Sequence, residues 1–481
     1  MTISGALSHA ISGLRAAGRG AEVVSSNISN ALTPGYGRRV LELSSSATGT
    51  VQIGGITRIV DASLASDKRL AEAEHANAKG SADFLARVEQ LLGTPDNPAS
   101  LAGRMSSFQS ALITAASRPD ATERLSAAVA DAQGLVTSLR SASAGIQEAR
   151  GIADRTIALH VDQMNTALSQ VVALNSQITA TQVQGGDVSA LQDARQRVVE
   201  TIAILAPVRE VPRDNGQIAL YTVGGAVLVD GTAAKIGFER SNVVTPYMAL
   251  STNTLSAVTI NGIPVQSGSE NGVLRGGAIG SQFAIRDELG VAAQAQIDAI
   301  ARDLVSRFQD PAVDPSLAAG DPGLFTDDGA AFNPVDERGL ASRLALNAAV
   351  DPAQGGDVWR IRDGMNAATP GAAGNASVLQ SFEAVLNAPR LPASGGFGGG
   401  VYSVIDLVAT VTSGIAGQRM IAEQELSYAG TRLTELTERQ LADGVDTDDE
   451  IQRLLMIEKS YAANAKVIQA VDEMMQTILR L

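Results

Sequence analysis

The chain has 481 residues, of which 45% are hydrophobic and 3% aromatic, with a formal net charge of −14 and no cysteine. This composition supports folded cores and about three domains, and it excludes disulfides, thiolate metal sites and a thiol nucleophile. The acidic balance disfavours nucleic acid and membranes as partners, and no run of 18 apolar residues marks a membrane span.

The first thirty residues carry small or apolar side chains at alternating steps of four and three. The positions are Ile3, Leu7, Ala10, Leu14, Ala17, Ala21, Val24, Ile28 and Ala31. This spacing predicts a helix whose apolar seam must pack against another helix. Pro34 and Gly35 end the helix in a tight turn, and residues 40–60 are expected to be extended.

Helical periodicity returns over residues 61–92 and again over 101–115. The longest regular stretch, residues 125–178, keeps the four–three stepping and predicts one helix of ~80 Å. Gly185-Gly186-Asp187 then turns the chain into a shorter return helix that ends near Leu205.

Residues 208–275 alternate in polarity and contain turn pairs such as Asn215-Gly216 and Asn261-Gly262. These pairs suit hairpin turns and predict a small β domain inserted between helices. Helix is expected to resume over residues 285–308. Residues 310–400 are rich in Gly, Pro and Asp and are expected to be irregular, apart from a helical piece near Val378–Leu386.

Two helices, 401–441 and 447–481, are predicted to close the chain, with Thr447 as the cap of the last one and Glu450 completing a capping box. The last helix has its own seam: Leu454, Ile457, Tyr461, Asn464, Ile468, Val471, Met475 and Ile478. The polar Asn464 on this seam has two interpretations. It fixes register and partner number in an assembly, or it hydrogen-bonds a neighbouring helix of the same subunit.

The order of elements predicts a mainly α fold with an inserted β domain, built as an elongated multi-domain rod. If the two ends pair, the β insert is expected to lie farthest from them. We expect three parts: a coiled-coil-like assembly domain of terminal helices (1–60 plus 442–481), a long helical rod domain (61–207 plus 276–441, with 310–400 irregular), and a small outer β domain (208–275).

No group of residues predicts catalysis, a cofactor or a metal. The three histidines, His9, His75 and His160, do not share a helix turn, as a pair of metal ligands on a helix would. The acidic group at 446–450 lacks the alternating ligands and central glycine of a calcium loop, and no lysine follows the glycine run 395–400.

The segment Ser26–Tyr36 resembles the N-terminal signature of the bacterial flagellar axial proteins, which comprise rod, hook and hook-associated proteins. The signature positions are Asn27, Asn30, Thr33, Pro34, Gly35 and Tyr36. Residues 461–474 resemble the matching closing signature. Residues 55–61 lead into long helices, which resembles the hook-associated junction members; rod and hook proteins usually continue into mostly β domains.

The resemblance implies an extracellular structural protein of the bacterial flagellum, not an enzyme, exported unfolded through the flagellar type III apparatus without a cleaved signal peptide. It implies a ring of about eleven subunits between hook and filament. The implied partners are other copies of the chain, the hook protein, the second hook–filament junction protein and an export chaperone bound at about 440–481.

The two seams are then the predicted assembly interface, and the free chain is expected to have frayed ends over 1–40 and 445–481. The interface residues are Ile3, Leu7, Leu14, Val24, Ile28, Leu454, Ile457, Tyr461, Asn464, Ile468, Val471, Met475 and Ile478. Three alternatives stay open: another rod or hook subunit, a different secreted coiled-coil interaction protein, and an enzyme built around a carboxylate pair.

Overall fold

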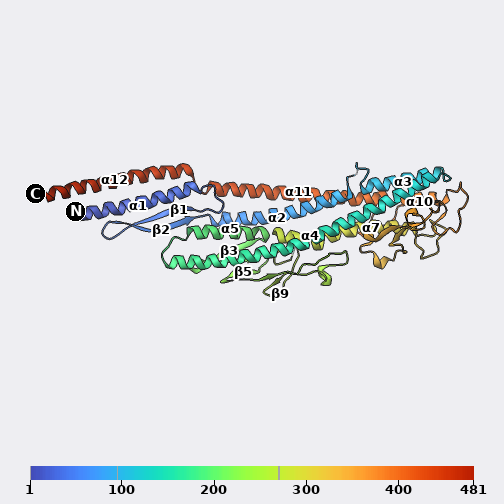
Figure 1. Ribbon diagram of the computed structural model, residues 1–481, viewed down its shortest axis with the longest axis horizontal. Helices are drawn as coiled ribbons and strands as arrows, with labels where there is room; N and C mark the ends of the chain where they lie inside the picture. Colours follow the sequence, from blue (N-terminus) through green and yellow to red (C-terminus); the bar gives the residue numbers. More distant parts are fainter. Residues whose placement is uncertain (1, 95, 269–270, 481) are drawn as a thin grey trace.

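The computed structural model describes residues 2–94, 96–268 and 271–480. They form an elongated, mainly helical rod in which both chain ends lie at the same end (Figure 1). The predicted fold class is confirmed. The principal helices are α1 (Ile3–Ser29), α2 (Ala62–Leu92), α3 (Leu101–Ser117), α4 (Thr122–Val183), α5 (Ser189–Leu205), α6 (Gly277–Ala284), α7 (Gly290–Phe308), α10 (Ser377–Asn387), α11 (Val404–Ala442) and α12 (Thr447–Leu479).

Helix α4 is the long axis of the rod. Its 62 residues correspond to ~93 Å of helix, longer than the ~80 Å predicted from its heptads. Predicted stripe positions such as Leu125, Leu139, Ile146 and Ile157 are buried along it. The stripe is buried because α2, α3, α5, α6 and α7 pack along successive stretches of α4, and α11 lies beside α2.

The end of the rod remote from the termini holds most of one large hydrophobic core. The first half of α4 contributes to it together with residues 313–386, most of which were expected to be irregular, apart from the helical piece at 378–386. That region contains short strands and helices: β10 (Phe325–Asp327), α8 (Leu340–Arg343), β11 (Leu344–Leu346), α9 (Arg360–Asp363) and α10. Phe325 and Phe382 pack against Phe308 with ring centroids 5.0 Å apart, so this region belongs to the folded rod.

The β insert forms a second core against the second half of α4, where Ile157, Val161, Leu168 and Val171 are buried. A four-stranded antiparallel sheet has the order β3-β4-β5-β6, and a three-stranded sheet has the order β7-β8-β9. The strands are β3 (Val208–Pro212), β4 (Ile218–Thr222), β5 (Val227–Asp230), β6 (Thr232–Ala233), β7 (Ile236–Gly237), β8 (Thr259–Ile260) and β9 (Ile263–Pro264).

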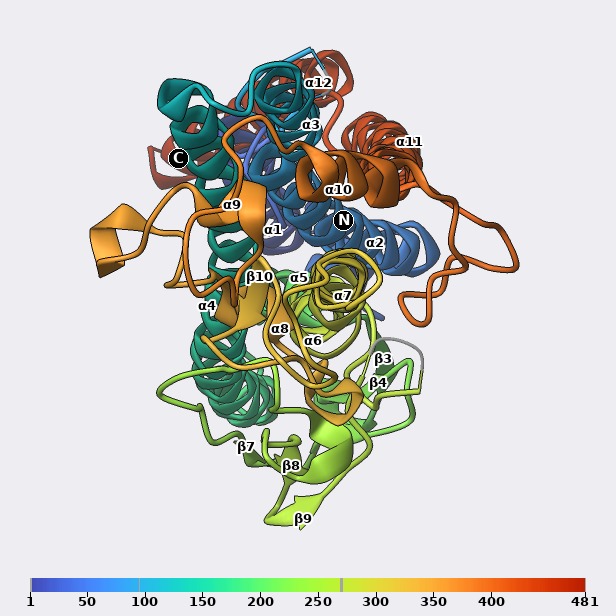
Figure 2. The ribbon, with the colours of Figure 1, turned by 90° about the vertical axis from the view of Figure 1, so that its right-hand side faces the viewer.

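The expectation that this insert lies farthest from the termini is wrong. It lies beside the middle of the rod and projects to one side (Figures 1 and 2). The reason is the length of α4, which carries the chain from the remote end back toward the termini before the insert begins.

Helix resumes at Gly277, eight residues before the predicted start at 285. The segment begins without a capping side chain, at Gly276 and Gly277, both of which have positive φ. A π-helical segment at Ile285–Leu289 then joins α6 to α7. There the buried Arg286 guanidinium pairs with the buried Asp154 carboxylate at 2.7 Å, which ties α4 to this junction. Within the described residues, no helix has both the length and the hydropathy needed to cross a bilayer.

Candidate assembly interface

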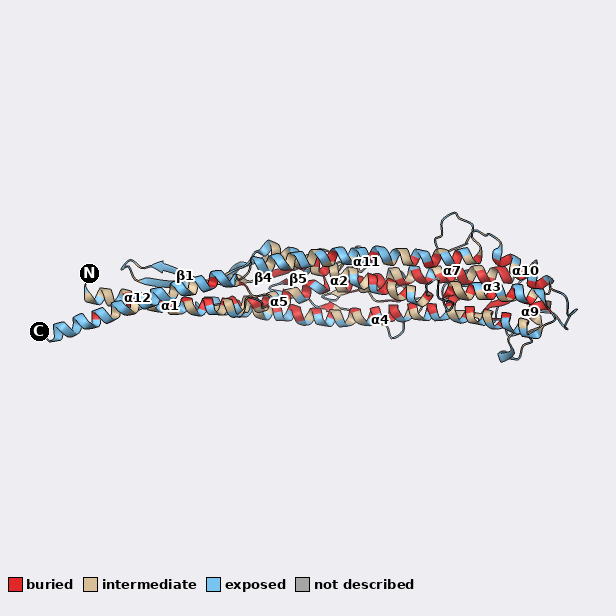
Figure 3. Cartoon of the chain, turned by 90° about the horizontal axis from the view of Figure 1, so that it is seen from above, coloured by how far each residue is buried: buried red, intermediate tan, exposed pale blue. Residues whose placement is uncertain are grey.

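The two terminal helices, α1 and α12, pack side by side as an antiparallel pair (Figures 1 and 3). Two glycines of α1 define the register. A Cβ at Gly13 would lie 2.6 Å from Asn464 Nδ2, and a Cβ at Gly20 would lie 3.1 Å from Ile457 Cδ1. The two contacts are seven residues apart on both helices, in opposite directions, although Gly13 and Gly20 each lie one residue away from the predicted seam of α1. Glycine lets the two backbones approach closely at these positions.

Part of each predicted seam is buried inside this pair. On α1, Val24 is buried, and Ile3, Leu7, Leu14 and Ile28 are half-buried. On α12 the positions divide into three classes: Val471 is buried, Leu454, Ile457, Asn464 and Ile468 are half-buried, and Tyr461, Met475 and Ile478 are exposed. The heptads therefore serve, in part, to pair the two ends of one chain.

Asn464 lies against Gly13, and its Nδ2 donates a 3.0 Å hydrogen bond to the Ser460 carbonyl of its own helix. The amide nitrogen of Asn464 is therefore hydrogen-bonded within α12. Asn464 packs against α1, but its side-chain hydrogen bond stays within α12, so the interpretation in which it hydrogen-bonds a neighbouring helix of the same subunit is not confirmed.

The other faces of α12 expose many apolar side chains. Figure 3 shows exposed residues along most of this helix. Nine large apolar side chains of the 33-residue α12 are exposed, against three of the 62-residue α4, so apolar exposure is concentrated at the terminal end of the rod. The nine are Ile451, Leu455, Met456, Tyr461, Val467, Met474, Met475, Ile478 and Leu479.

A β-hairpin completes the terminal unit. Strands β1 (Arg38–Ser45) and β2 (Val51–Ile59) pair antiparallel and pack against α1. Between the hairpin, α1 and α12 lies a groove of about 690 Å³. Small residues of α1 form part of its lining, among them Gly13, Ala16, Ala17 and Gly20; larger apolar side chains, including Leu41 and Met456, line the rest.

The signature residue Asn27 is fully buried where α1, α12 and the hairpin meet. Its Nδ2 donates to the Arg39 carbonyl at 2.9 Å and to Glu450 Oε2 at 3.0 Å. Its Oδ1 accepts from the Tyr36 hydroxyl and from the Arg39 backbone N–H, both at 2.9 Å. All four hydrogen bonds of this side-chain amide join α1 to other segments of the chain.

The rest of the signature shapes the loop that follows α1. Asn30 donates to the Ser26 carbonyl at 2.9 Å, and Thr33 donates to Asn30 Oδ1 at 3.3 Å. Pro34 is exposed, and Gly35 has φ +75°, a backbone region that favours glycine. Burial raises the pKa of Tyr36 above its ordinary value, and its ring lies under the Arg39 guanidinium.

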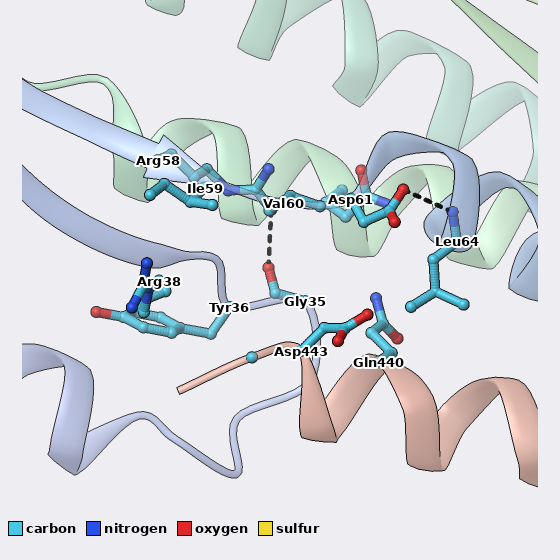
Figure 4. A pocket seen from close by; sticks show the side chains of 12 residues that line it. Gly35, Tyr36, Arg38, Arg58, Ile59, Val60, Asp61, Leu64, Gln440 and Asp443 are labelled. Carbon is cyan, nitrogen blue, oxygen red and sulfur yellow. Dashed lines mark hydrogen bonds between the residues drawn. The ribbon is translucent and has the colours of Figure 1, made fainter. Parts of the chain in front are cut away.

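An ionic cluster joins this loop to the rod. Asp193 of α5 accepts from the Gly37 backbone N–H at 3.0 Å and pairs with Arg39 at 3.0 Å and Arg58 at 2.6 Å. Arg58 also donates to the Gly35 carbonyl, as Figure 4 shows beside Gln440 and Asp443 at the end of α11. Sequence reasoning missed Asp193, which stands 154 residues from Arg39 and carries no motif.

The start of α12 differs from the prediction. Asp446, not Thr447, is the cap: its carboxylate accepts from the backbone N–H groups of Asp448 and Asp449. Glu450 does not complete a capping box, because its carboxylate is buried against Asn27 and pairs with Arg453 at 2.9 Å. Both Asp446 and Thr447 are competent caps, so composition alone did not decide between them.

Nothing in the described part of the chain groups three or more His, Cys, Asp or Glu side chains as a metal site. His9, at the edge of the groove, hydrogen-bonds the Gly49 carbonyl through Nδ1 at 3.0 Å. The terminal end of the rod thus offers apolar surface and a structural polar cluster.

Two segments match family models. Residues 85–312 match the flagellar hook-associated protein FlgK helical domain, and residues 442–481 match the flagellar basal body rod FlgEFG protein C-terminal model. The second match coincides with α12 and the turn before it.

Curated relatives include flagellar hook-associated protein 1 of Salmonella typhimurium strain LT2, 27% identical over 244 residues. The protein of the same name from Escherichia coli strain K12 is 25% identical over 244 residues. Each alignment covers 48% of this chain and 44% of the relative, so the chain spans less than half the length of these relatives. Among solved structures, the flagellar hook junction protein FlgK from Burkholderia pseudomallei aligns with TM-score 0.44 and 22% identity, over 54% of this chain and 46% of that one.

Proposed function

We propose that the chain is a structural member of the flagellar hook-associated protein family and that it joins hook to filament at the flagellar junction. It does so by polymerising through its terminal helices. Its place is extracellular, in the flagellum, and it reaches that place through the flagellar export apparatus.

The observation that carries this proposal is the concentration of exposed apolar side chains on α12, beside the groove that α1 and the hairpin border. Exposed apolar side chains concentrated on one element are typical of a protein interface. At ~25 cal/mol per Å², covering such surface between neighbours favours assembly. The seam residues that the α1–α12 pair half-buries would be covered further in the assembled state.

The chain divides, in this proposal, as the sequence suggested. Residues 1–60 and 442–481 are the assembly domain, 61–207 and 276–441 the rod domain, and 208–275 the β insert. The signature cluster around Asn27 and Asp193 sets the angle between the assembly domain and the rod domain. The family signature thus acts through structure, since its side chains bond one another and Glu450.

The partners in this proposal are further copies of the chain in a ring of about eleven, the hook protein, the second hook–filament junction protein, and an export chaperone at about 440–481. The exposed face of α12 suits a chaperone before assembly and a neighbouring subunit afterwards, because both would cover the same apolar side chains.

Electron microscopy of a strain lacking this gene tests the proposal. A junction protein predicts hooks without filaments, with filaments restored by the gene on a plasmid. Cells without hooks would indicate a rod or hook subunit. Normal filaments would indicate a secreted coiled-coil protein of another role and would overturn the proposal.

A further inference from the structure

A cavity of about 540 Å³ lies where the hairpin and the rod meet, on a side of Arg58 that the terminal helices do not line. The end of β2, the first turns of α2, the helix α5 and strand β3 enclose it. Its polar lining residues are Arg58, Ser66, Arg69, Gln192, Arg195, Gln196 and Glu210. It adjoins the smaller pocket of Figure 4, with which it shares Arg58, Val60 and Gln196.

Three arginines line this cavity in a chain whose net charge is −14. Arg69 and Arg195 are 4% and 8% exposed, so both guanidinium groups are largely removed from water. Arg58 pairs with Asp193, which Arg39 shares, and Arg69 pairs with Glu210 at 3.2 Å. Two further carboxylates, Glu72 and Glu200, do not line the cavity and are held by Lys68.

Arg195 has no carboxylate within ion-pair distance among the described residues. Its guanidinium donates to two neutral oxygens, Asn175 Oδ1 at 2.8 Å and the Gly216 carbonyl at 2.7 Å. Burial lowers the pKa of Arg195, and the charge of the Glu210 carboxylate offsets only part of this effect. The ionisable residues that line the cavity are three arginines and one carboxylate, Glu210.

Two donor atoms of lining residues, Nε of Arg69 and Nε2 of Gln196, are shielded from solvent and have no hydrogen-bond partner among the described residues. A buried donor without an acceptor costs about 1–3 kcal/mol, so the protein alone does not fully satisfy these two side chains. Buried arginines with free N–H groups are the usual recognition elements for carboxylates and phosphates.

We propose that this cavity binds a small oxyanion of the carboxylate or phosphate class. The anion balances the charge of Arg195, lies among the arginine and glutamine side chains that line the cavity, and braces the hairpin against α2 and α5. This inference does not depend on the junction role, because it rests on the charges and donors of the rod alone.

Isothermal titration calorimetry of the full chain tests the site, with inorganic phosphate and succinate as separate probes and sodium chloride keeping the ionic strength constant. Saturable binding of either probe to the wild type is expected. Binding of phosphate alone, or of succinate alone, identifies which oxyanion the site accepts.

Two substitutions in the lining are expected to change the affinity for the oxyanion in opposite directions. Gln196→Glu places a carboxylate among the arginines and should weaken binding at least about tenfold. Glu210→Gln frees Arg69 and should strengthen binding, a result that misfolding cannot produce. Arg140→Gln, at an exposed arginine of α4, should leave the affinity unchanged. Binding heats of both probes that equal those of sodium chloride, or an affinity that is the same in the wild type and all three variants, would overturn the proposal.

Discussion

The side-chain amide of Asn27, near the end of α1, donates a 3.0 Å hydrogen bond to the buried carboxylate of Glu450, 423 residues later in the first turn of α12. Because Asn27 also binds Tyr36 and the Arg39 backbone, this one contact joins both ends of the chain to the loop that leads into the hairpin. The orientation of the terminal pair therefore depends on a few buried polar groups.

Glu450→Ala should destabilise the terminal pair by about 1–3 kcal/mol, because it leaves Asn27 with one acceptor fewer in a buried site. The free energy of local opening, measured by native-state hydrogen exchange of α12 amides, reports the effect. Glu458→Ala, at an exposed glutamate of the same helix, should change that free energy by less than about 0.5 kcal/mol. Equal effects of the two substitutions would mean that the Asn27 contact contributes nothing.

Gly13→Ala should separate α1 from α12, because the new Cβ would lie 2.6–2.9 Å from the side-chain atoms of Asn464. We expect a loss of about 1–3 kcal/mol in the opening free energy of the pair. Gly18→Ala is the matched change, with no atom within 4 Å of the new Cβ, and should stabilise α1 by up to about 1 kcal/mol. Adding Asn464→Ala to Gly13→Ala should restore most of the loss; no restoration would refute the register.

Amide exchange of the unassembled chain should be much faster in α12 than in α4. Only Glu450 and Val471 are buried on α12, whereas α4 buries residues along its whole length, and local stability follows buried contacts. Exchange is measured by mass spectrometry of peptides from both helices. Assembly should slow exchange over α1 and α12. Equal protection of α12 and α4 in the free chain would contradict the expectation that the ends order on docking.

Asp298 should make stability depend on pH. Its buried carboxyl accepts from the Gly339 and Ala341 N–H groups, and burial raises its pKa to about 6. The unfolded pKa is about 3.9, so the folded state holds the proton more tightly. The protonated Asp298 carboxyl therefore adds up to about 3 kcal/mol to the free energy of unfolding. This stabilisation is fully present below about pH 4 and is lost as pH rises through about 6.

Urea unfolding of wild type and Asp298→Asn between pH 4 and 7 measures this dependence. The variant should lose the part of the slope that falls between pH 4 and 6, whatever its overall stability. Asp336→Asn, at an exposed aspartate near the same loop, should keep the wild-type slope. An unchanged slope in Asp298→Asn would show that this carboxyl does not titrate in the window.

The long helices could be predicted because each carries its periodicity locally. The periodicity of residues 125–178 predicted both ends of α4 to within five residues, and the two apolar seams predicted the helices α1 and α12. The heptads also predicted that the terminal helices need partners. They could not predict that α1 and α12 are partners of each other, because the same pattern suits a helix from another chain.

The chemistry of the signature could not be predicted from its residues alone. Asn27 and Tyr36 stood out in the sequence, but Asp193, Arg58 and Glu450 meet them only through the tertiary fold. The predicted position of the β insert was also wrong, because that position depends on how far α4 carries the chain back toward the termini. The 310–400 region was underestimated, since its short elements gain their stability by packing against α4 and α7.

The proposal that terminal helices assemble the junction is tested most directly by one pair of substitutions in a strain lacking the gene. Leu455, 52% exposed on α12, and Leu159, 61% exposed on α4, are each changed to Glu, and filaments are counted by electron microscopy. Both purified variants should fold as the wild type does, since neither side chain is buried. We predict that Leu455→Glu leaves hooks without filaments and that Leu159→Glu restores them. Wild-type filaments with Leu455→Glu would contradict assembly through the exposed face of α12.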